Sequence, residues 1–234
     1  MKCNICGCEK FGDFNNRKNV MCLQCRSLER TRLLFMYLQK LDISRDTKIL
    51  HFAPEKGLYD HLYGVFGENY HPADIDPSRY KYARNIKKID LINIGEDVIQ
   101  SNSYDLIIHS HVLEHIPCNI AYILFHLHRI LKPTGSHICI IPFTHGKWDE
   151  SFQDLSEDEK TKRFGQFDHV RRFGNQDIHA TLGKIINLPD CFDAGKDFDE
   201  QSLIDANIPK NQWTGFMMAT VLCLKKYDYK LLNL

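Results

Sequence analysis

The sequence has no excess of charge of either sign. Among its 234 residues, 30 are lysine or arginine and 30 are aspartate or glutamate, so the formal net charge at pH 7 is zero. Proteins that bind nucleic acid through phosphate contacts are usually basic. The neutral balance therefore argues against nucleic acid as a partner of this chain.

Long apolar runs are also missing. No run approaches the roughly 20 apolar residues that span a bilayer, and Met1-Lys2-Cys3-Asn4 lacks the apolar core of a signal peptide. We therefore expect a cytoplasmic protein without a membrane span. Internal repeats and low-complexity linkers are absent from the sequence, and the length suits one α/β domain with a small additional module.

Cysteine, in contrast, is abundant, with nine residues. In an intracellular chain this points to metal binding or buried thiols rather than disulfides. Two Cys-x-x-Cys pairs stand near the start, Cys3 with Cys6 and Cys22 with Cys25. Each pair can place two thiolates on one metal from a tight turn, and two such turns close a tetrahedral site. We predict a structural Zn²⁺ site; the alternative is two reduced thiol turns without a metal.

The cysteine region is short, so it cannot bury much core and a metal would supply much of its folding energy. Cys8 could replace Cys6 as a ligand, although the symmetric spacing favours Cys6. Four cysteine ligands indicate a closed structural site without an open position for catalysis. We assign residues 1–27 to this zinc-binding module and residues 28–234 to the main domain.

The middle of the chain has the pattern of a βαβ unit. An apolar run over residues 106–108 precedes a helix-length apolar run over 121–131, and a second short apolar run over 138–141 follows the break at Lys132-Pro133-Thr134-Gly135. Such a unit implies a parallel sheet. Ligands of these sheets bind beyond the carboxyl ends of the strands. Histidines and a glutamate follow residue 108 at that place.

Three segments of this region resemble class I S-adenosylmethionine-dependent methyltransferases: Tyr104-Asp105-Leu106, Val112-Leu113-Glu114-His115 and Arg129-Ile130-Leu131-Lys132-Pro133-Thr134-Gly135. The resemblance covers residues 47–142. It implies an α/β, Rossmann-like fold with a mostly parallel seven-stranded sheet and helices on both faces. It also implies an enzyme that uses S-adenosyl-L-methionine.

The resemblance further implies where the cofactor binds. After a first strand, the family has a glycine-rich loop that passes close to the methionine part of the cofactor. Here the loop is Ala53-Pro54-Glu55-Lys56-Gly57, and only Gly57 remains of the usual glycines. Ala53 is small enough for close approach. Glu55 is a candidate partner of the methionine ammonium; alternatively it begins the next helix, where an early carboxylate complements the dipole.

Three further residues complete the predicted cofactor site. Asp74 matches the family position whose carboxylate accepts both ribose hydroxyls; the alternative is a helix N-cap, for which Asp76 is better placed. Asp90 resembles the acid that accepts from the adenine amino group; the alternative is an aspartate in a surface turn. His109 is expected at a strand end under the cofactor. We interpret His115 as a structural histidine that ties the loop to the helix.

The acceptor side is expected in an insertion over about residues 143–175. It mixes aspartate, histidine and arginine with aromatic residues, as a polar substrate pocket requires. His145 or His169 is the predicted general base, and Arg171 is the predicted anion clamp. A lone surface histidine is more often inert, so each of these assignments has a structural alternative.

Together these features predict an S-adenosylmethionine-dependent methyltransferase that O-methylates a sugar or a phosphorylated small molecule. The four-cysteine start, the loop from His51 to Glu55 and the segment Asp168-His169-Val170-Arg171 resemble bacterial methyltransferases of surface-glycan biosynthesis, so the expected acceptor is a small molecule or a glycan precursor. One alternative is a ribosomal RNA methyltransferase, since some of these also begin with a zinc module. Another is a non-catalytic scaffold with a decayed cofactor site, which the missing glycines favour and the two retained aspartates oppose. The sequence leaves the oligomeric state open.

Overall fold

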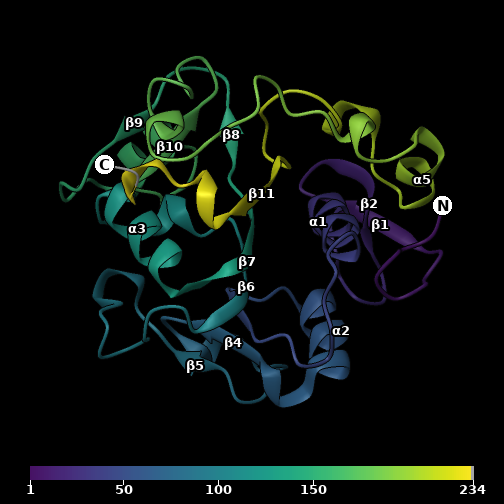
Figure 1. Ribbon diagram of the computed structural model, residues 1–234. Helices are drawn as coiled ribbons and strands as arrows, with labels where there is room; N and C mark the ends of the chain where they lie inside the picture. The colour runs from purple at the N-terminus through teal and green to yellow at the C-terminus, as the bar shows by residue number, and fades with distance from the viewer. Residues whose placement is uncertain (233–234) are drawn as a thin grey trace.

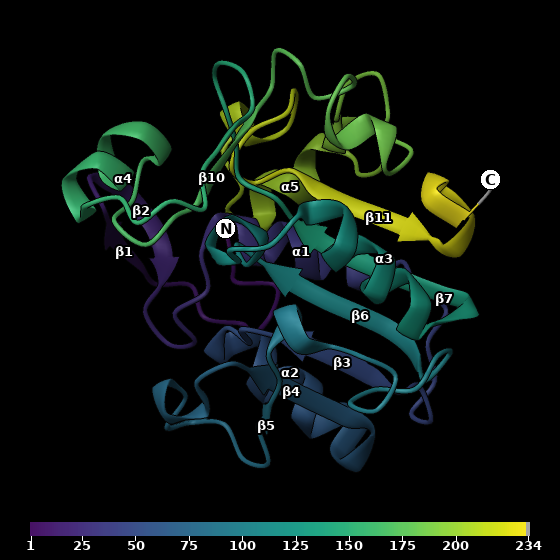
Figure 2. The same ribbon diagram turned by 90° about the vertical axis from the view of Figure 1, so that its left-hand side faces the viewer.

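The centre of the molecule is a six-stranded sheet in a computed structural model that describes residues 1–232. Its strands, in spatial order, are β11 (Val221–Lys225), β7 (Leu131–Ile140), β6 (Tyr104–Ser110), β3 (Ile49–Phe52), β4 (Tyr70–Asp74) and β5 (Lys87–Lys88). All neighbouring strands pair in parallel except β11, which is antiparallel to β7. Figure 2 shows β6 and β11 running in opposite directions. This confirms the mostly parallel, Rossmann-like α/β sheet.

The predicted seventh strand is wrong, because the described residues contribute six strands to this sheet. The chain between β7 and β11 adds no strand to this sheet within the described residues. Over residues 187–206 that chain forms 3₁₀ turns and helix α5 (Glu200–Asp205) instead. Asp193 and Asp199 start these elements by accepting hydrogen bonds from the backbone N–H groups of Gly195 and Ser202. Acidic caps and turn residues thus stand where an apolar strand would be needed.

Helices cover both faces of the sheet, as predicted (Figure 1). Helices α1 (Glu29–Gln39) and α2 (Lys56–Phe66) pack on the face that carries Leu106 and Ile108 of β6. Helix α3 (Ile120–Ile130) packs on the opposite face, which carries Ile107. This follows from the alternation of side chains along a strand.

The cysteine region is a hairpin of β1 (Phe11–Phe14) and β2 (Arg17–Cys22) followed by a turn into α1. Arg32 of α1 ties it to the rest of the chain. This side chain is fully buried, and it donates hydrogen bonds to the carbonyl oxygens of Ser27, Ala206 and Asn207 at 2.7–2.8 Å. Figure 1 shows the N-terminus lying beside α5. The cysteine region, α1 and the α5 segment therefore form one packed corner.

A second small sheet lies within residues 143–175. It consists of β8 (Phe143–Thr144), β10 (Arg171–Gly174) and β9 (Asp149–Glu150) in that order, and helix α4 (Glu157–Phe164) connects β9 to β10. The N–H of Val170 donates to the carbonyl of Glu114 at 2.9 Å. This contact joins the small sheet to the loop after β6.

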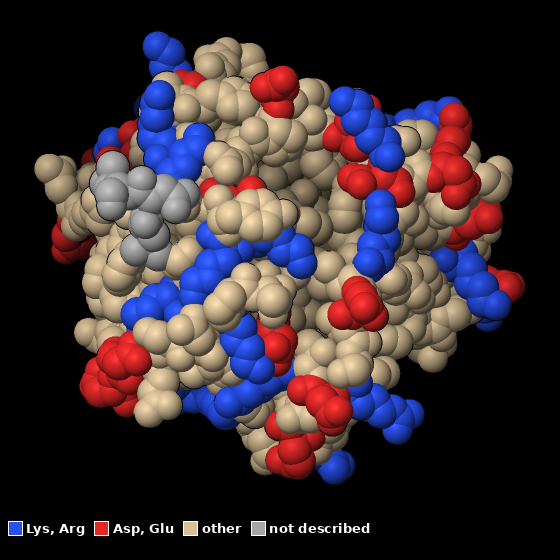
Figure 3. Space-filling view, in the orientation of Figure 1, with Lys and Arg blue, Asp and Glu red and all other residues tan. Residues whose placement is uncertain are grey.

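Charges of both signs are mixed over the face shown in Figure 3. A row of lysine and arginine side chains crosses this face, and aspartate and glutamate side chains border it. This mixing agrees with the zero net charge of the sequence. Within residues 1–232, no helix combines the length and apolarity needed to cross a membrane.

Candidate active site

A cavity of about 430 Å³ opens at the carboxyl ends of the parallel strands. Its wall includes the residues at the ends of three neighbouring strands: Phe52 and Ala53, Asp74 and Ile75, and His111 and Val112. The volume lies within the roughly 300–1,000 Å³ typical of small-molecule sites. Ligands of open α/β sheets bind at this edge.

Asp74 lines the cavity at the end of β4, as the sequence predicts. Its Oδ1 accepts from the N–H of Asp76 at 2.8 Å, and its Oδ2 accepts from the hydroxyl of Tyr80 at 2.7 Å. A carboxylate has about four acceptor sites, so these two bonds orient it and leave about two sites for a ligand. The N-cap role belongs to Asp76, which accepts from the N–H of Ser78.

Asp90 also lines the cavity, and it holds a turn at the same time. One carboxylate oxygen accepts from the N–H of Ile92 at 2.9 Å, and the other accepts from the amide of Asn93 at 2.8 Å. The two interpretations of this residue are therefore compatible. The turn fixes the carboxylate at the wall of the cavity.

Ala53 lines the cavity in a left-handed conformation, with φ at 49°. Glycine adopts this conformation without steric cost, whereas alanine does not. Gly57 lies elsewhere: a Cβ at this position would stand 3.0 Å from both the carbonyl oxygen and the sulfur of Cys25. The remaining glycine thus allows the cysteine region to approach α2 and does not contact the cavity.

Glu55 is partly buried and does not line the cavity. Its Oε2 is 3.8 Å from His51 Nε2 and has no hydrogen bond among residues 1–232. Burial raises the pKa of Glu55, but the contact with His51 and the charge of Arg30 outweigh it, so the pKa lies below its usual value. Arg30 Nε is also buried and unbonded within the described chain. Opposite charges with unused hydrogen-bonding capacity therefore lie close to the Ala53 loop.

His109 does not line the cavity. The strand β6 extends to Ser110, so His109 lies inside the sheet, is fully buried, and faces His137 with ring centroids 4.9 Å apart. Burial lowers the pKa of His109 well below its usual value. His111 reaches the cavity instead; sequence reasoning placed it beyond the strand end but gave it no role in the site. The crowding of three histidines into residues 109–115 was the available signal.

His115 and Asp168 form the other end of the cavity. His115 Nδ1 is 3.2 Å from Asp168 Oδ2, and Gln166 donates to Asp168 Oδ1 at 2.7 Å. His115 therefore faces the cavity, rather than only tying the loop to the helix as predicted. His169 packs against His115 with ring centroids 4.6 Å apart, although it does not line the cavity. Burial lowers the pKa of His169, which favours its neutral imidazole.

Glu114 lies beside these histidines and is 1% exposed. Its Oε1 is 3.3 Å from His111 Nδ1 and 4.0 Å from His115 Nε2. Burial raises the pKa of Glu114, but the nearby imidazoles outweigh it and the pKa lies below its usual value. An ionised carboxylate is therefore buried at the histidine end of the cavity.

Two residues predicted for the acceptor side lie away from the cavity. Arg171 is fully buried and donates to the carboxylate of Glu150 at 2.7 Å and to the carbonyls of Leu113 and Cys118. All three guanidinium nitrogens are thus engaged, which argues against a role as an anion clamp. His145 is exposed, and its Nε2 lies 3.4 Å from the Gln176 amide.

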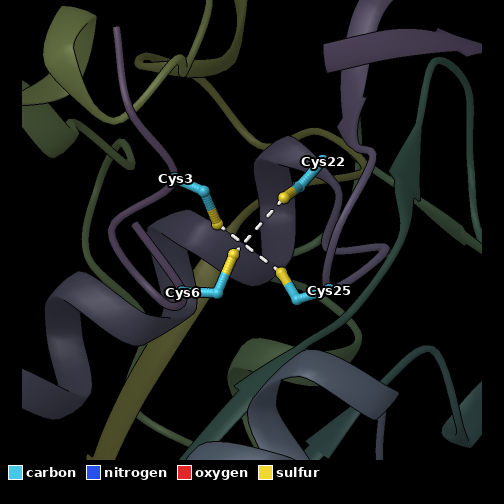
Figure 4. Close-up of side chains that lie close together, drawn as sticks. All are labelled: Cys3, Cys6, Cys22 and Cys25. Carbon is cyan, nitrogen blue, oxygen red and sulfur yellow. Dashed lines mark hydrogen bonds between the residues drawn. The ribbon is translucent and has the colours of Figure 1, made fainter. Parts of the chain in front are cut away.

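The four predicted cysteine ligands do meet (Figure 4). Their sulfurs lie within 4.8 Å of one another, with Cys3 to Cys25 at 3.6 Å and Cys6 to Cys22 at 3.5 Å. A Zn–S bond of about 2.3 Å in tetrahedral geometry places neighbouring sulfurs roughly 3.8 Å apart. The geometry therefore fits a zinc ion. Cys8 lies outside the cluster, where its sulfur contacts the backbone of Lys10.

A family profile described as "Methyltransferase domain" matches residues 29–182, which is more than half of the chain. No curated protein matches the chain significantly. Among solved structures, a putative sarcosine dimethylglycine methyltransferase from Galdieria sulphuraria is 21% identical, with a TM-score of 0.42 over 60% of this chain and 55% of that one. A SAM-dependent methyltransferase from Aquifex aeolicus is 16% identical, with a TM-score of 0.43 over 70% and 84%.

A third similar structure, the CurJ carbon methyltransferase, is 20% identical, with a TM-score of 0.39 over 50% of this chain. The match spans 35% of the CurJ chain, so this chain corresponds to about a third of it. Such distant likenesses concern the fold alone, whereas the profile match covers five of the six strands of the sheet, the cavity and its carboxylates. The chain belongs to the methyltransferase-domain family.

Proposed function

We propose that this chain is an S-adenosylmethionine-dependent enzyme that O-methylates a hydroxyl group of a small polar molecule, such as a sugar, a glycan precursor or a phosphorylated metabolite. The observation that carries the proposal is the division of one cavity into a carboxylate end, with Asp74 and Asp90, and a histidine end, with His111 and His115. The neutral net charge and the mixed surface in Figure 3 favour a small acceptor over RNA.

The carboxylate end suits the nucleoside part of S-adenosylmethionine. Asp74 has about two free acceptor sites for the two adjacent ribose hydroxyls, and Asp90 is held where it can accept from the adenine amino group. Glu55 and Arg30 carry the charges opposite to those of the methionine ammonium and carboxylate. Ala53 is small, so the backbone of its loop can pass close to the methionine part of the cofactor.

The histidine end suits the acceptor. When bound, the cofactor supplies a methyl group on a sulfonium, which is a good leaving group. The protein's task is then to position the hydroxyl and to ease the loss of its proton. Imidazole and carboxylate groups gather at this end, where His169 lies against His115. Of the two predicted bases, His145 and His169, it is His169 that lies beside this end of the cavity.

Calorimetric titration of S-adenosylhomocysteine into the full chain tests the cofactor site. We expect micromolar binding by the wild type. Asp74→Ala removes charge-assisted hydrogen bonds of about 2–4 kcal/mol and should weaken binding roughly 30-fold to 1,000-fold. Asp76→Ala is the matched control, because Asp76 only caps a turn; it should bind like the wild type. Absence of wild-type binding would overturn the proposed function.

We also propose that Cys3, Cys6, Cys22 and Cys25 hold a structural zinc ion, with residues 1–27 as its module and residues 28–234 as the methyltransferase domain. The sulfur distances and the close contact of Gly57 with Cys25 support this. Three of the four cysteines are at most 6% exposed, so a metal there would be enclosed.

Zinc analysis and thermal unfolding test the module. Cys22→Ser should lower the zinc content by one ion per chain and cause a large loss of stability, because binding at such sites is coupled to folding. Cys8→Ser removes a cysteine outside the cluster and should change neither quantity. Equal zinc contents in the two variants would contradict the assignment.

A further inference from the structure

Three side chains with metal-binding groups converge beside the histidine end of the cavity. They are Glu114, His115 and His169, and one ligand atom from each lies within 4.8 Å of the others. Glu114 and His115 come from the loop after β6, and His169 comes from the chain just before β10. The contact between these two segments is fixed by the backbone hydrogen bond from Val170 to Glu114.

Glu114 has unused coordination capacity. It is 1% exposed, and neither carboxylate oxygen has a hydrogen bond among residues 1–232. A buried carboxylate without donors is costly, so such a group usually pairs with a cation or binds a metal. The nearest groups are Nδ1 of His111 at 3.3 Å and Nε2 of His115 at 4.0 Å. A neutral imidazole at these positions does not supply the positive charge that the carboxylate lacks.

Both histidines are oriented as metal ligands are. His169 Nδ1 lies 3.2 Å from the carbonyl oxygen of Phe164, which can only accept, so Nδ1 carries the proton and Nε2 has a free lone pair. His115 Nδ1 is likewise held 3.2 Å from the carboxylate of Asp168. Metal-binding histidines typically donate their other N–H to a carboxylate or a backbone carbonyl.

We infer that Glu114, His115 and His169 form a binding site for a divalent transition-metal cation. Two imidazoles and one carboxylate suit Zn²⁺, Co²⁺, Ni²⁺, Mn²⁺ or Fe²⁺ better than Mg²⁺ or Ca²⁺. Metal–ligand bonds of roughly 2.0–2.2 Å require ligand atoms about 3–4 Å apart, and the present ligand atoms lie within 4.8 Å of one another. Unlike the four-cysteine cluster, three protein ligands leave coordination positions open.

This site deepens the proposed function and rests on it. His115 lines the cavity, so an open position on the cation faces the space proposed for the acceptor. A cation there would bind the acceptor oxygen and make its hydroxyl proton easier to remove, so His169 would act as a metal ligand in place of the base. The cation keeps its oxidation state, and the proton leaves to water at the mouth of the cavity. Two neighbouring oxygens, as in a sugar diol, would chelate best, which narrows the acceptor class.

Titration with Co²⁺ alone tests the site in the full chain after its cysteine cluster has been loaded with one equivalent of zinc, which leaves the three-ligand site open. Cobalt bound by imidazole and carboxylate gives a visible d–d spectrum without the strong thiolate charge-transfer band of a cysteine site. We expect one Co²⁺ per chain in addition to zinc. Glu114→Gln and His169→Gln should each weaken cobalt binding more than roughly 100-fold, since even the loss of an outer partner costs about 10–100-fold.

Two further variants separate the site from general structural effects. Asp168→Asn removes a positioning residue and should weaken cobalt binding by about 10-fold. His179→Gln changes an exposed histidine outside the cluster and should leave it unchanged. S-adenosylhomocysteine titration of the same samples shows that each variant is folded.

The outcomes are distinguishable from those of the proposed function. Wild-type cobalt binding that is no tighter than in Glu114→Gln, or that appears only with the thiolate band, would overturn the metal site. If S-adenosylhomocysteine still binds in that case, the proposed function stands without the metal. If the wild type binds cobalt but not S-adenosylhomocysteine, the metal site stands and the proposed function fails.

Discussion

The two ends of the cavity are built by contacts of different range. At the carboxylate end, Asp74 is held by Asp76 and Tyr80, and Asp90 by Ile92 and Asn93, all within six residues of the carboxylate. At the histidine end, His115 pairs with Asp168 across 53 positions of sequence (168 minus 115). The first end is encoded locally, whereas the second exists only when distant segments dock.

This difference indicates which end of the cavity can change its ligand without affecting the other end. Local turns at strand ends position the two carboxylates proposed to bind the cofactor, Asp74 and Asp90. The acceptor end depends on β10 and the chain before it, so changes there should alter acceptor binding and leave cofactor binding intact. Three substitutions test whether the two ends of the cavity are built independently.

The largest effect is expected for Arg171→Met, in the strand β10 that is bonded to the loop after β6. The change leaves the carboxylate of Glu150 and the carbonyls of Leu113 and Cys118 without their buried partner. Removing one partner of a buried pair costs about 3–5 kcal/mol. We expect that loss in the free energy of unfolding, measured by urea denaturation, together with loss of methyl transfer.

The affinity of Arg171→Met for S-adenosylhomocysteine tests whether the two ends of the cavity are independent of one another. Distant, independent sites couple by only about 0.3–0.5 kcal/mol, so the affinity for S-adenosylhomocysteine should stay within about twofold at temperatures where the variant is folded. Arg172→Met is the matched control, since Arg172 makes one long hydrogen bond of 3.4 Å to Lys147. A parallel collapse of cofactor affinity in Arg171→Met would show that the ends form one unit.

Short patterns predicted the locally encoded parts of this molecule. The two Cys-x-x-Cys pairs define their own turns. Asp74 and Asp90 were placed through the resemblance of their short segments to family positions at strand ends. In each case the residue type and a few neighbours determine the geometry, so the parallel sheet and most of the carboxylate end could be predicted.

The failures involve register and distant packing. His109 was expected at a strand end, but β6 continues to Ser110, and a shift of this kind moves a side chain from the cavity into the core. Arg171 has the charge of an anion clamp, but its partners lie 21 to 58 residues away in sequence. Gly57 matched a family glycine, whereas its neighbour is Cys25. None of these contacts is visible in a local pattern.

A smaller effect is expected for Gly57→Ala, which tests what the remaining glycine does. The added methyl group would stand 3.0 Å from the backbone oxygen and the sulfur of Cys25. Overpacking typically costs about 1–3 kcal/mol, and alanine returns up to about 1 kcal/mol in a helix. We therefore expect a net loss of about 1–2 kcal/mol in thermal unfolding, with weaker zinc retention.

The matched control is Gly64→Ala in the same helix, where the added methyl group meets no atom within 4 Å. It should stabilise the protein by about 0.4–1 kcal/mol. A loss of stability in Gly57→Ala together with a gain in Gly64→Ala would show that the cysteine region requires a glycine at position 57. If Gly57→Ala were as stable as Gly64→Ala and instead lost cofactor affinity, the family role of this glycine would be restored.

The smallest effect is expected for Ala53→Gly, at the carboxylate end. The left-handed φ of 49° strains alanine by roughly 1–2 kcal/mol, and glycine removes this strain but loses about 0.5–1 kcal/mol through its greater unfolded entropy. The net change in unfolding free energy should be a stabilisation below about 1 kcal/mol, with S-adenosylhomocysteine affinity unchanged. Ala73→Gly, at the fully buried alanine of β4, has no such strain to relieve and should destabilise. If both changes destabilise equally, the Ala53 conformation carries no strain, and the altered loop is as well suited to alanine as the family loop is to glycine.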